Sequence, residues 1–225
     1  MSLNIYEKLD IPEGKKGVAV SREQAEFMYR FLKKKKVNVT LETGFAYGCS
    51  AAHIISATRK KHYVIDPFQE KFGNLGLKNI QRLGLNKFIL FKKDFSHIIL
   101  PKLVEEGVRL DFAFIDGGHN YDDVFVDFFY IDIMLKKQGY VLFHDSWMRS
   151  TQLVASWIKT NKRNYKSIKI PIKNLILFQK TGKDNRTWNH FKEFYSLRSI
   201  VGHNLFNLRY HENQSFGRGA SKKTD

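Results

Sequence analysis

The 225-residue sequence has a single cysteine, Cys49, and this scarcity excludes two kinds of covalent stabilisation. One thiol cannot form an intramolecular disulfide, and it cannot build the multi-thiolate cage of a structural zinc site. The sequence also lacks any run of about 18 uncharged apolar residues, so we expect no membrane-spanning helix. Residues 1–10 carry charges and lack the apolar core of a secretory signal peptide, which favours a cytoplasmic protein.

Acidic residues are scarce beside basic ones. The chain has 38 Lys and Arg against 22 Asp and Glu, which gives a net charge of +16. Between Asp145 and Asp184 no carboxylate occurs, and the basic residues there are Arg149, Lys159, Lys162, Arg163, Lys166, Lys169, Lys173, Lys180 and Lys183. This stretch is either a solvated lysine-rich surface or an electrostatic surface for an acidic substrate, a nucleic acid or an anionic membrane.

The order of apolar and amphipathic segments predicts one α/β domain. Short apolar segments alternate with helical ones, which is typical of a mostly parallel sheet covered by helices on both faces. The expected strands are 37–41, 63–65, 88–91, 112–115, 140–143, 167–170 and 175–179. The expected helices between them are 49–58, 73–83, 96–105, 122–136 and 151–162. Two consecutive strands at the end predict a closing hairpin with one antiparallel strand.

The two ends of the chain differ from this pattern. Ser21 followed by Gln24 resembles a capping box, so we expect an N-terminal helix at 21–32. Residues 1–183 then form the domain, and 184–225 form a C-terminal extension. Within the extension, 217–225 have no periodicity and are expected to be disordered.

Two glycines stand at the junction of the first strand and the following helix. Gly44 and Gly48 would let the backbone turn tightly and approach a ligand at a helix N-terminus. Their Gly-x-x-x-Gly spacing is not the Gly-x-Gly-x-x-Gly pattern of dinucleotide sites. Asp66 ends the second strand, where a carboxylate can accept hydrogen bonds from both ribose hydroxyls. Any α/β unit can need glycines here, but together with Asp66 they predict a nucleoside site.

Acidic and histidine residues end two later strands. Asp116 and His119 follow the fourth strand, and His144 and Asp145 end the fifth. Ligands of open α/β sheets bind outside the carboxyl ends of the strands, so Asp116 and Asp145 are expected in one crevice. The two carboxylates could hold Mg²⁺, and His119 could accept a proton near neutral pH. The plainer alternatives are a turn-forming Asp116, a helix-initiating surface His119 and a packed strand residue at His144.

These segments resemble the class I S-adenosylmethionine-dependent methyltransferases, and in particular a bacterial branch with sugar O-methyltransferases that is related to the catechol O-methyltransferase group. The likeness extends over about residues 18–181, and it is carried by the segments 42–50, 65–69, 114–127 and 139–145. It implies a Rossmann-like three-layer sandwich, with a seven-stranded, mostly parallel sheet whose last strand is antiparallel.

The resemblance also implies residue roles. Glu42 and Gly44 would line the methionine part of the cofactor, with Ser50 at its carboxylate and Asp66 at its ribose. The segment 94–97 would lie near the adenine. The implied cofactor residues are thus Glu42, Gly44, Gly48, Ser50, Asp66, Asp94, Ser96 and His97. Asp116 and Asp145 stand at metal-ligand positions and His119 at the position of the base. Ser146 departs from the pattern, because relatives often carry Asn or Asp there.

The expected activity is transfer of a methyl group from S-adenosylmethionine to a hydroxyl of a small-molecule or glycan acceptor, with an anionic acceptor suggested by the net charge. His119 and Asp116 are the expected catalytic residues, and a cation on Asp116 and Asp145 would orient the acceptor oxygen. An RNA methyltransferase is the first alternative: the basic stretch supports it, but Asn/Asp-Pro-Pro-Tyr and Pro-Cys motifs are absent. A non-catalytic cofactor-binding module is the second alternative.

Overall fold

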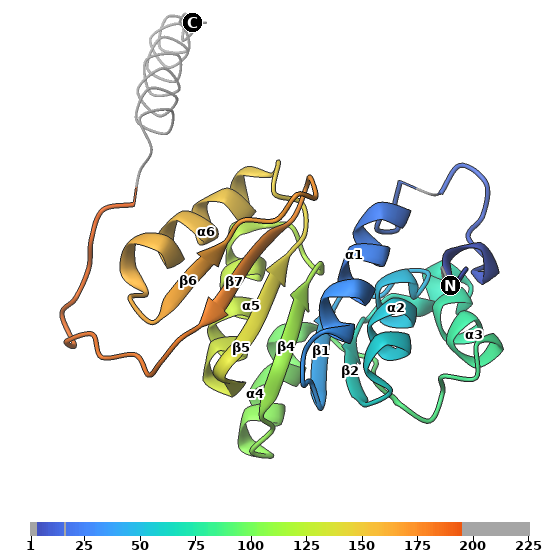
Figure 1. Ribbon diagram of the computed structural model, residues 1–225, viewed down its shortest axis with the longest axis horizontal. Helices are drawn as coiled ribbons and strands as arrows, with labels where there is room; N and C mark the ends of the chain where they lie inside the picture. Colours follow the sequence, from blue (N-terminus) through green and yellow to red (C-terminus); the bar gives the residue numbers. More distant parts are fainter. Residues whose placement is uncertain (1–3, 16, 195–225) are drawn as a thin grey trace, which may run out of the picture.

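The alternation of strands and helices along the chain produces three layers, a central sheet between two sets of helices (Figure 1). The computed structural model describes residues 4–15 and 17–194, so the disorder expected at 217–225 lies outside the described part. The strands are β1 (Val39–Thr43), β2 (Lys61–Ile65), β3 (Ile89–Lys92), β4 (Leu110–Ile115), β5 (Leu135–Phe143), β6 (Tyr165–Ile168) and β7 (Ile176–Lys180). The α-helices are α1 (Arg22–Lys33), α2 (Cys49–Thr58), α3 (Leu75–Arg82), α4 (Ser96–Glu105), α5 (Tyr121–Met134) and α6 (Arg149–Asn161), with short 3₁₀ turns η1 (Tyr6–Lys8) and η2 (Gln69–Phe72).

The sheet has seven strands in the order β3-β2-β1-β4-β5-β7-β6. Strands β1 to β5 are parallel, and β7 runs antiparallel to both β5 and β6, which confirms the expected fold class. The last residues of four parallel strands lie in register: Thr43 pairs with Ile65 and with Ile115, and Ile115 pairs with Phe143. The loops that follow β1, β2, β4 and β5 therefore leave the sheet at one edge.

Each face of the sheet is covered by three helices. One face carries Phe112 and Phe114 and packs against α1, α2 and α3. The other carries Phe143 and packs against α4, α5 and α6, with Phe128 of α5 fully buried. The predicted capping box is present, because Ser21 accepts from the Gln24 backbone and the Gln24 side chain accepts from Ser21 N–H. This box fixes the start of α1 beside the edge where the loops gather.

Most elements begin or end one to five residues from the predicted bounds, and the contacts of the structure explain two of these differences. The first strand was expected at 37–41 but spans Val39–Thr43, because the N–H groups of Asn38 and Val39 donate to the Asp111 carboxylate. The helix expected to reach Lys136 ends at Met134, and β5 begins at once, since Leu135 pairs with Leu110 of β4. Both differences depend on Leu110 and Asp111, which lie far along the chain from the first strand.

Part of the expected C-terminal extension lies against α6. The side-chain amide of Asn161 donates to the carbonyl of Lys192 and accepts from its N–H, at 2.9 and 2.8 Å. Ser156 Oγ donates to the carbonyl of Phe194 at 2.7 Å. Residues 192–194 are therefore held to the helix by hydrogen bonds to two of its side chains. In the described part of the chain, no helix has the length and apolar character needed to cross a membrane.

Candidate active site

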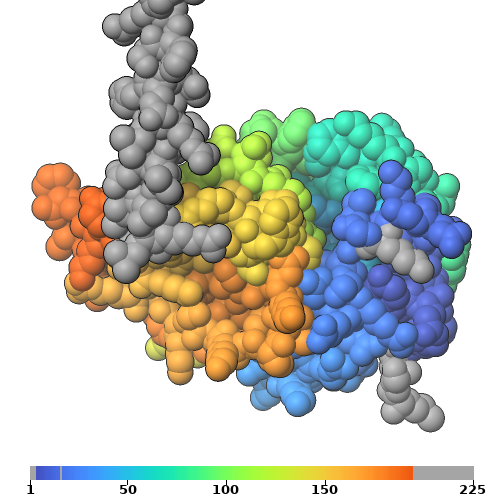
Figure 2. All heavy atoms as spheres, turned by 90° about the horizontal axis from the view of Figure 1, so that it is seen from above, coloured from blue at the N-terminus to red at the C-terminus, as the bar shows by residue number. Residues whose placement is uncertain are grey.

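A cavity of about 830 Å³ lies at the edge of the sheet where the loops after β1, β2, β4 and β5 meet. The segment before α1 closes one side of it. Figure 2 shows this N-terminal part, in blue, lying beside the orange segment that precedes β7, and the Gln24 amide joins the two by donating to the Lys173 carbonyl. The predicted site residues in the cavity wall are Gly44, Ser50, Asp66, Ser96, His97, Asp116, His119 and Asp145. Glu42, Gly48 and Asp94 do not contribute to the wall.

The glycine loop needs Gly44 for a reason internal to the protein. Gly44 has a φ of +83°, and a Cβ atom placed on it would lie 2.1 Å from the backbone oxygen of Asp116. The loops after β1 and β4 thus touch, backbone against backbone, at the floor of the cavity. This contact requires a glycine at position 44 whether or not a ligand approaches the loop as the sequence predicts. Gly48 has a φ of +72° and stands at the N-cap of α2.

The Asp66 carboxylate binds the backbone of the glycine loop. One of its carboxylate oxygens accepts from the N–H groups of Phe45 and Ala46 at 2.9 and 3.2 Å. The other oxygen accepts from Phe68 N–H at 2.6 Å. A buried carboxylate with three backbone donors fixes the relative positions of the loops after β1 and β2. Asp66 still lines the cavity and keeps acceptor capacity for a ligand hydroxyl.

Glu42 lies under the loop and faces the protein interior. It is fully buried, and Nε2 of His62 on β2 lies 3.5 Å from its Oε2 atom. Burial raises the pKa of Glu42, and this effect outweighs the opposing contribution of His62. The expectation that Glu42 lines the cavity is therefore not met in this structure.

The far side of the cavity carries an aromatic group that the sequence analysis did not single out. Phe95 and Phe68 contact edge to face with ring centroids 5.6 Å apart, and Phe95 stacks on His97 at 5.4 Å. Both phenylalanines are exposed although they are large and apolar. Asp94, next to them, instead accepts from the Phe95 N–H. Exposed aromatic faces beside Ser96 and His97 suit a planar ring such as adenine.

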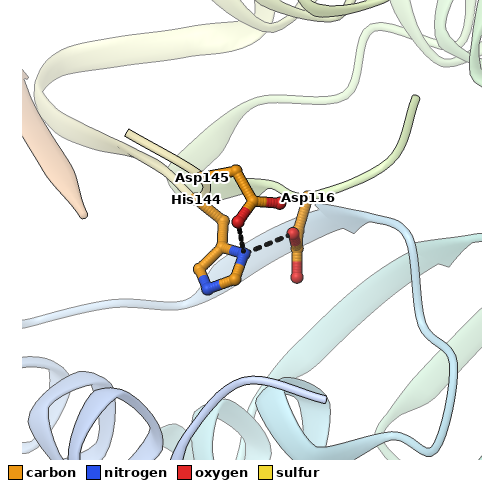
Figure 3. A group of neighbouring side chains, drawn as sticks. All are labelled: Asp116, His144 and Asp145. Carbon is orange, nitrogen blue, oxygen red and sulfur yellow. Dashed lines mark ion pairs between the residues drawn. The ribbon is translucent and has the colours of Figure 1, made fainter. Parts of the chain in front are cut away.

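The loops after β4 and β5 bring two acids and two histidines together. His144 Nδ1 lies 2.8 Å from Asp116 Oδ1 and 3.4 Å from Asp145 Oδ1, and Figure 3 shows the imidazole directed at the two carboxylates. His119 Nε2 lies 2.9 Å from Asp145 Oδ2. The predicted group of Asp116, His119 and Asp145 is thus assembled as expected, and His144 is an additional member.

Each ionisable group of this cluster is shifted by its neighbours. Burial lowers the pKa of His144, but its contacts with Asp116 and Asp145 outweigh burial and raise the pKa to about 9. The hydrogen bond to Asp145 raises the pKa of His119 above its usual range. Hydrogen bonds from His119 and His144 hold the pKa of Asp145 far below its usual range, whereas burial raises that of Asp116.

Three further side chains hold Asp145 and His144 in place. The Trp147 indole N–H and the Asn174 amide donate to Asp145 Oδ1 at 3.0 and 3.1 Å. Gln24 Oε1 lies 3.2 Å from His144 Nε2. Asp145 itself has a φ of +51°, in the left-handed region, which the surrounding contacts must hold. No local pattern marks Gln24 or Asn174 as a site residue, because they reach the site from distant parts of the chain.

The donor atoms of this cluster fit a divalent cation. One ligand atom each from Asp116, His144 and Asp145 lie within 4.8 Å of one another. Carboxylate oxygen and imidazole nitrogen are both ordinary ligands of divalent metals. Ser146, the departure noted in the sequence, does not line the cavity, and its backbone N–H faces the carbonyl of Asn174 at 3.5 Å.

The basic stretch does not form one uniform surface. Lys162 is 6% exposed and lies between the carboxylates of Asp132 and Asp184, while Lys180 also pairs with Asp132. Among the described residues, the cavity wall contains neither Lys nor Arg. The stretch therefore includes internal ion pairs, and its exposed cations do not line the cavity.

Part of the chain matches a known protein family. Residues 41–146 match the family described as methyltransferase domain. The chain is 26% identical over 143 residues to the catechol O-methyltransferase of Niastella koreensis, a match that spans 63% of this chain and 63% of that protein, less than two thirds of its length.

Solved structures share the fold at low identity. An O-methyltransferase from Bacillus cereus in complex with SAH aligns with a TM-score of 0.64 and 14% identity, over 72% of this chain and 83% of that one. The O-methyltransferase TomG from Streptomyces achromogenes, in complex with SAM, aligns with a TM-score of 0.63 and 18% identity, over 79% of this chain and 86% of that one. Residues 41–146 therefore match a methyltransferase domain, and the chain has the Rossmann-like fold of these solved O-methyltransferase structures.

Proposed function

We propose that the protein transfers the methyl group of S-adenosylmethionine to a hydroxyl group of a small-molecule or glycan acceptor. The observation that carries the proposal is the cluster of Asp116, His119, His144 and Asp145 in the wall of the same cavity as the glycine loop. The cavity is large enough for a cofactor with a small acceptor. The related structures with bound SAM and SAH support the choice of cofactor.

The cofactor would lie between the glycine loop and the aromatic pair. Gly44 and Ser50 would face its methionine part, Asp66 its ribose, and Phe95 with Ser96 and His97 its adenine. This leaves the Asp116–His119 loop at the reacting end. The sulfonium methyl group would then lie beside His119, where an acceptor oxygen can approach in line.

His119 would act as the general base. Its Nε2 atom pairs with Asp145 Oδ2, so Nδ1 is the nitrogen that remains to take the acceptor proton. A carboxylate on one side of an imidazole fixes the ring and stabilises the imidazolium that forms. Asp116 and Asp145 would hold a divalent cation such as Mg²⁺. When bound, the cation would lower the pKa of the acceptor hydroxyl and fix its position.

The rim next to the cluster indicates which acceptors fit. Trp147 is 67% exposed and Val18 is 50% exposed, and both line the cavity with Met148. Such a surface can stack against an aromatic ring or the apolar face of a sugar. Because no described Lys or Arg lines the cavity, an anionic group on the acceptor would stay outside it, where the net positive charge would chiefly raise the association rate. For the same reason, the described part of the wall offers RNA phosphates no Lys or Arg partner.

The test is methyl transfer from labelled S-adenosylmethionine to a panel of catechols, phenols, free sugars, glycans and RNA. We expect turnover with a hydroxyl compound, loss of turnover in His119→Ala, and normal turnover in Lys159→Ala, whose side chain lies on the exposed surface of α6. Turnover only on RNA would favour the nucleic-acid alternative. Binding of the cofactor without turnover on any acceptor would favour a non-catalytic binding module.

A further inference from the structure

We propose that His144 is a direct ligand of the divalent cation, and that the resulting set of two oxygens and one nitrogen makes the site prefer Mn²⁺ and Co²⁺ to Mg²⁺. The inference rests on the proposed cation at Asp116 and Asp145, and it deepens that proposal by naming the third protein ligand and the class of metal.

Two of the three donor-atom distances are those of neighbouring ligands around one metal ion, and all three atoms lie within 4.8 Å of one another. His144 Nδ1 lies 2.8 Å from Asp116 Oδ1 and 3.4 Å from Asp145 Oδ1. Adjacent ligands of an octahedral ion with bonds of about 2.1 Å lie roughly 3 Å apart. The three atoms also come from two neighbouring strand ends, β4 and β5, whose pairing of Ile115 with Phe143 holds them in register.

The hydrogen bonds around Nε2 of His144 orient the ring so that Nδ1 faces Asp116 and Asp145. The Gln24 amide donates to the Lys173 carbonyl at 3.2 Å, so its oxygen must face the opposite way. That oxygen accepts from Ser21 N–H at 2.8 Å and lies 3.2 Å from His144 Nε2. Since an amide oxygen can only accept, Nε2 carries a hydrogen. Without a metal, a proton on Nδ1 can bridge to the carboxylates, and a bound cation would replace that proton and take the Nδ1 lone pair. A hydrogen bond that fixes the tautomer in this way is the usual support of a metal-bound histidine.

Asn174 does not disturb this arrangement. Its side-chain nitrogen lies 3.3 Å from His144 Nε2, but it also donates to Asp145 Oδ1 at 3.1 Å. The Asn174 amide nitrogen has two N–H donors, and the Asp145 oxygen, which can only accept, uses one of them. The shorter of the two contacts of His144 Nε2 is the one to Gln24 Oε1, at 3.2 Å. Nδ1 of His144 and the carboxylates of Asp116 and Asp145 face one another, and a shared cation in place of the Nδ1 proton would bind all three.

Ser146 cannot supply the missing ligand instead. A neutral hydroxyl is a weaker donor than imidazole, and Ser146 does not line the cavity. Exchange of an oxygen ligand for a nitrogen ligand changes the preferred metal. Mg²⁺ favours all-oxygen sites, whereas imidazole suits first-row transition metals, for which affinity rises from Mn²⁺ to Co²⁺.

The experiment measures metal binding without turnover. Wild-type protein, His144→Ala and Ser146→Ala would be titrated with Mg²⁺ by calorimetry, with Mn²⁺ by electron paramagnetic resonance and with Co²⁺ by visible absorption. We expect the wild type to bind Mn²⁺ and Co²⁺ at least tenfold more tightly than Mg²⁺. In His144→Ala, the affinity for Co²⁺ should fall at least tenfold and the Co²⁺ absorption band should shift. Ser146→Ala should match the wild type in Co²⁺ affinity and in the position of the absorption band.

A measurement on the unchanged protein keeps the test independent of folding. Pulsed electron paramagnetic resonance of the Mn²⁺-loaded wild type should detect nitrogen bound directly to the metal. Absence of that coupling, or unchanged Co²⁺ binding and absorption in His144→Ala, would overturn the inference. Loss of Co²⁺ binding in Ser146→Ala alone would also overturn it, by naming a different ligand.

The two proposals fail in different ways. Nitrogen-coordinated Mn²⁺ in a protein that methylates no acceptor would leave this inference standing and remove the proposed function. Full methyl transfer in excess chelator, with no metal bound in any titration, would remove this inference and leave methyl transfer standing.

Discussion

His144 Nδ1 lies 2.8 Å from Asp116 Oδ1, across the ends of two adjacent parallel strands. The contact joins the β4 loop, which carries His119, to the β5 loop, which carries Asp145. Because Asp145 also bonds His119, the chemistry expected at His119 depends on both loops together.

Replacement of His119 by Gln should lower kcat by about 10²- to 10⁴-fold, the usual contribution of a general base. The hydrogen bond to Asp145 raises the pKa of His119, so the ring of the free enzyme stays protonated until the pH exceeds 6.5. Only the neutral ring can accept a proton, so kcat/KM should rise with pH through a midpoint above 6.5. Steady-state rates between pH 5 and 9 would show this limb in the wild type and in the Asp122→Asn control. A rate within a few-fold of wild type in His119→Gln would exclude the base role.

Replacement of Asp66 by Ala should weaken binding of S-adenosylhomocysteine by about 1–3 kcal/mol, the range for lost hydrogen bonds to a charged group. It should also lower the melting temperature, because the N–H groups of Phe45, Ala46 and Phe68 lose their acceptor. Calorimetric titration at a temperature well below the melting point separates the two effects. Unchanged affinity in a destabilised protein would mean that Asp66 only holds the loops, and that the ribose binds elsewhere.

The position of the site was predictable because it follows from topology. Alternating strands and helices place the carboxyl ends of parallel strands at one edge, so Asp66, Asp116 and Asp145 could be expected together from their places in the chain. The direction of an individual side chain could not be predicted in the same way. Glu42 stands one residue from the strand end, and whether it faces the cavity or His62 depends on the packing of β1 against β2.

The role of His144 could not be read from the sequence. A histidine at a strand end looks the same whether it packs in the core or faces a cavity. Its supporting residue, Gln24, lies 120 residues away and is marked in the sequence only as half of a capping box. The missing information is a long-range contact between α1 and the end of β5, which no local pattern carries.

Replacement of Asp127 by Asn should change how stability depends on pH. Burial in α5 raises the pKa of Asp127 to about 6 from an ordinary value of 3.8, and outweighs the hydrogen bonds of Ser96 and Thr43. The folded state therefore binds this proton more tightly than the unfolded state. Wild type should lose stability as the pH rises from about 4 to about 6, by about 3 kcal/mol for a shift of two pKa units.

Asp127→Asn removes this ionisable group, so the variant should not lose stability in this way as the pH rises. Its free energy of unfolding relative to wild type should therefore become more favourable by about 3 kcal/mol between pH 4 and pH 7. Urea unfolding at several pH values measures the difference, and Asp122→Asn, an exposed acid in the same helix, provides the control. Parallel stability curves for Asp127→Asn and wild type would show that folding does not shift the pKa of Asp127.

Replacement of Lys162 by Ala should destabilise the protein more than replacement of Lys159 by Ala, although both remove one positive charge from the same region of the chain. The Lys162 ammonium lies 2.5 Å from Asp132 Oδ2 and 2.7 Å from Asp184 Oδ2 and is almost fully buried, whereas Lys159 is exposed. Removal of one partner from an isolated buried ion pair typically costs about 3–5 kcal/mol. Here Lys180 still pairs with Asp132 and Arg186 with Asp184, so we expect a loss below that range but above that of an exposed lysine. An exposed lysine is usually worth within about 0.5 kcal/mol. Urea unfolding measures the free energy of unfolding of the two variants. Because both lose one positive charge, the difference between them reports the burial and the ion pairs of Lys162. Equal midpoints for the two variants would mean that Lys162 is solvated in solution, and that the basic stretch is a uniform charged surface after all.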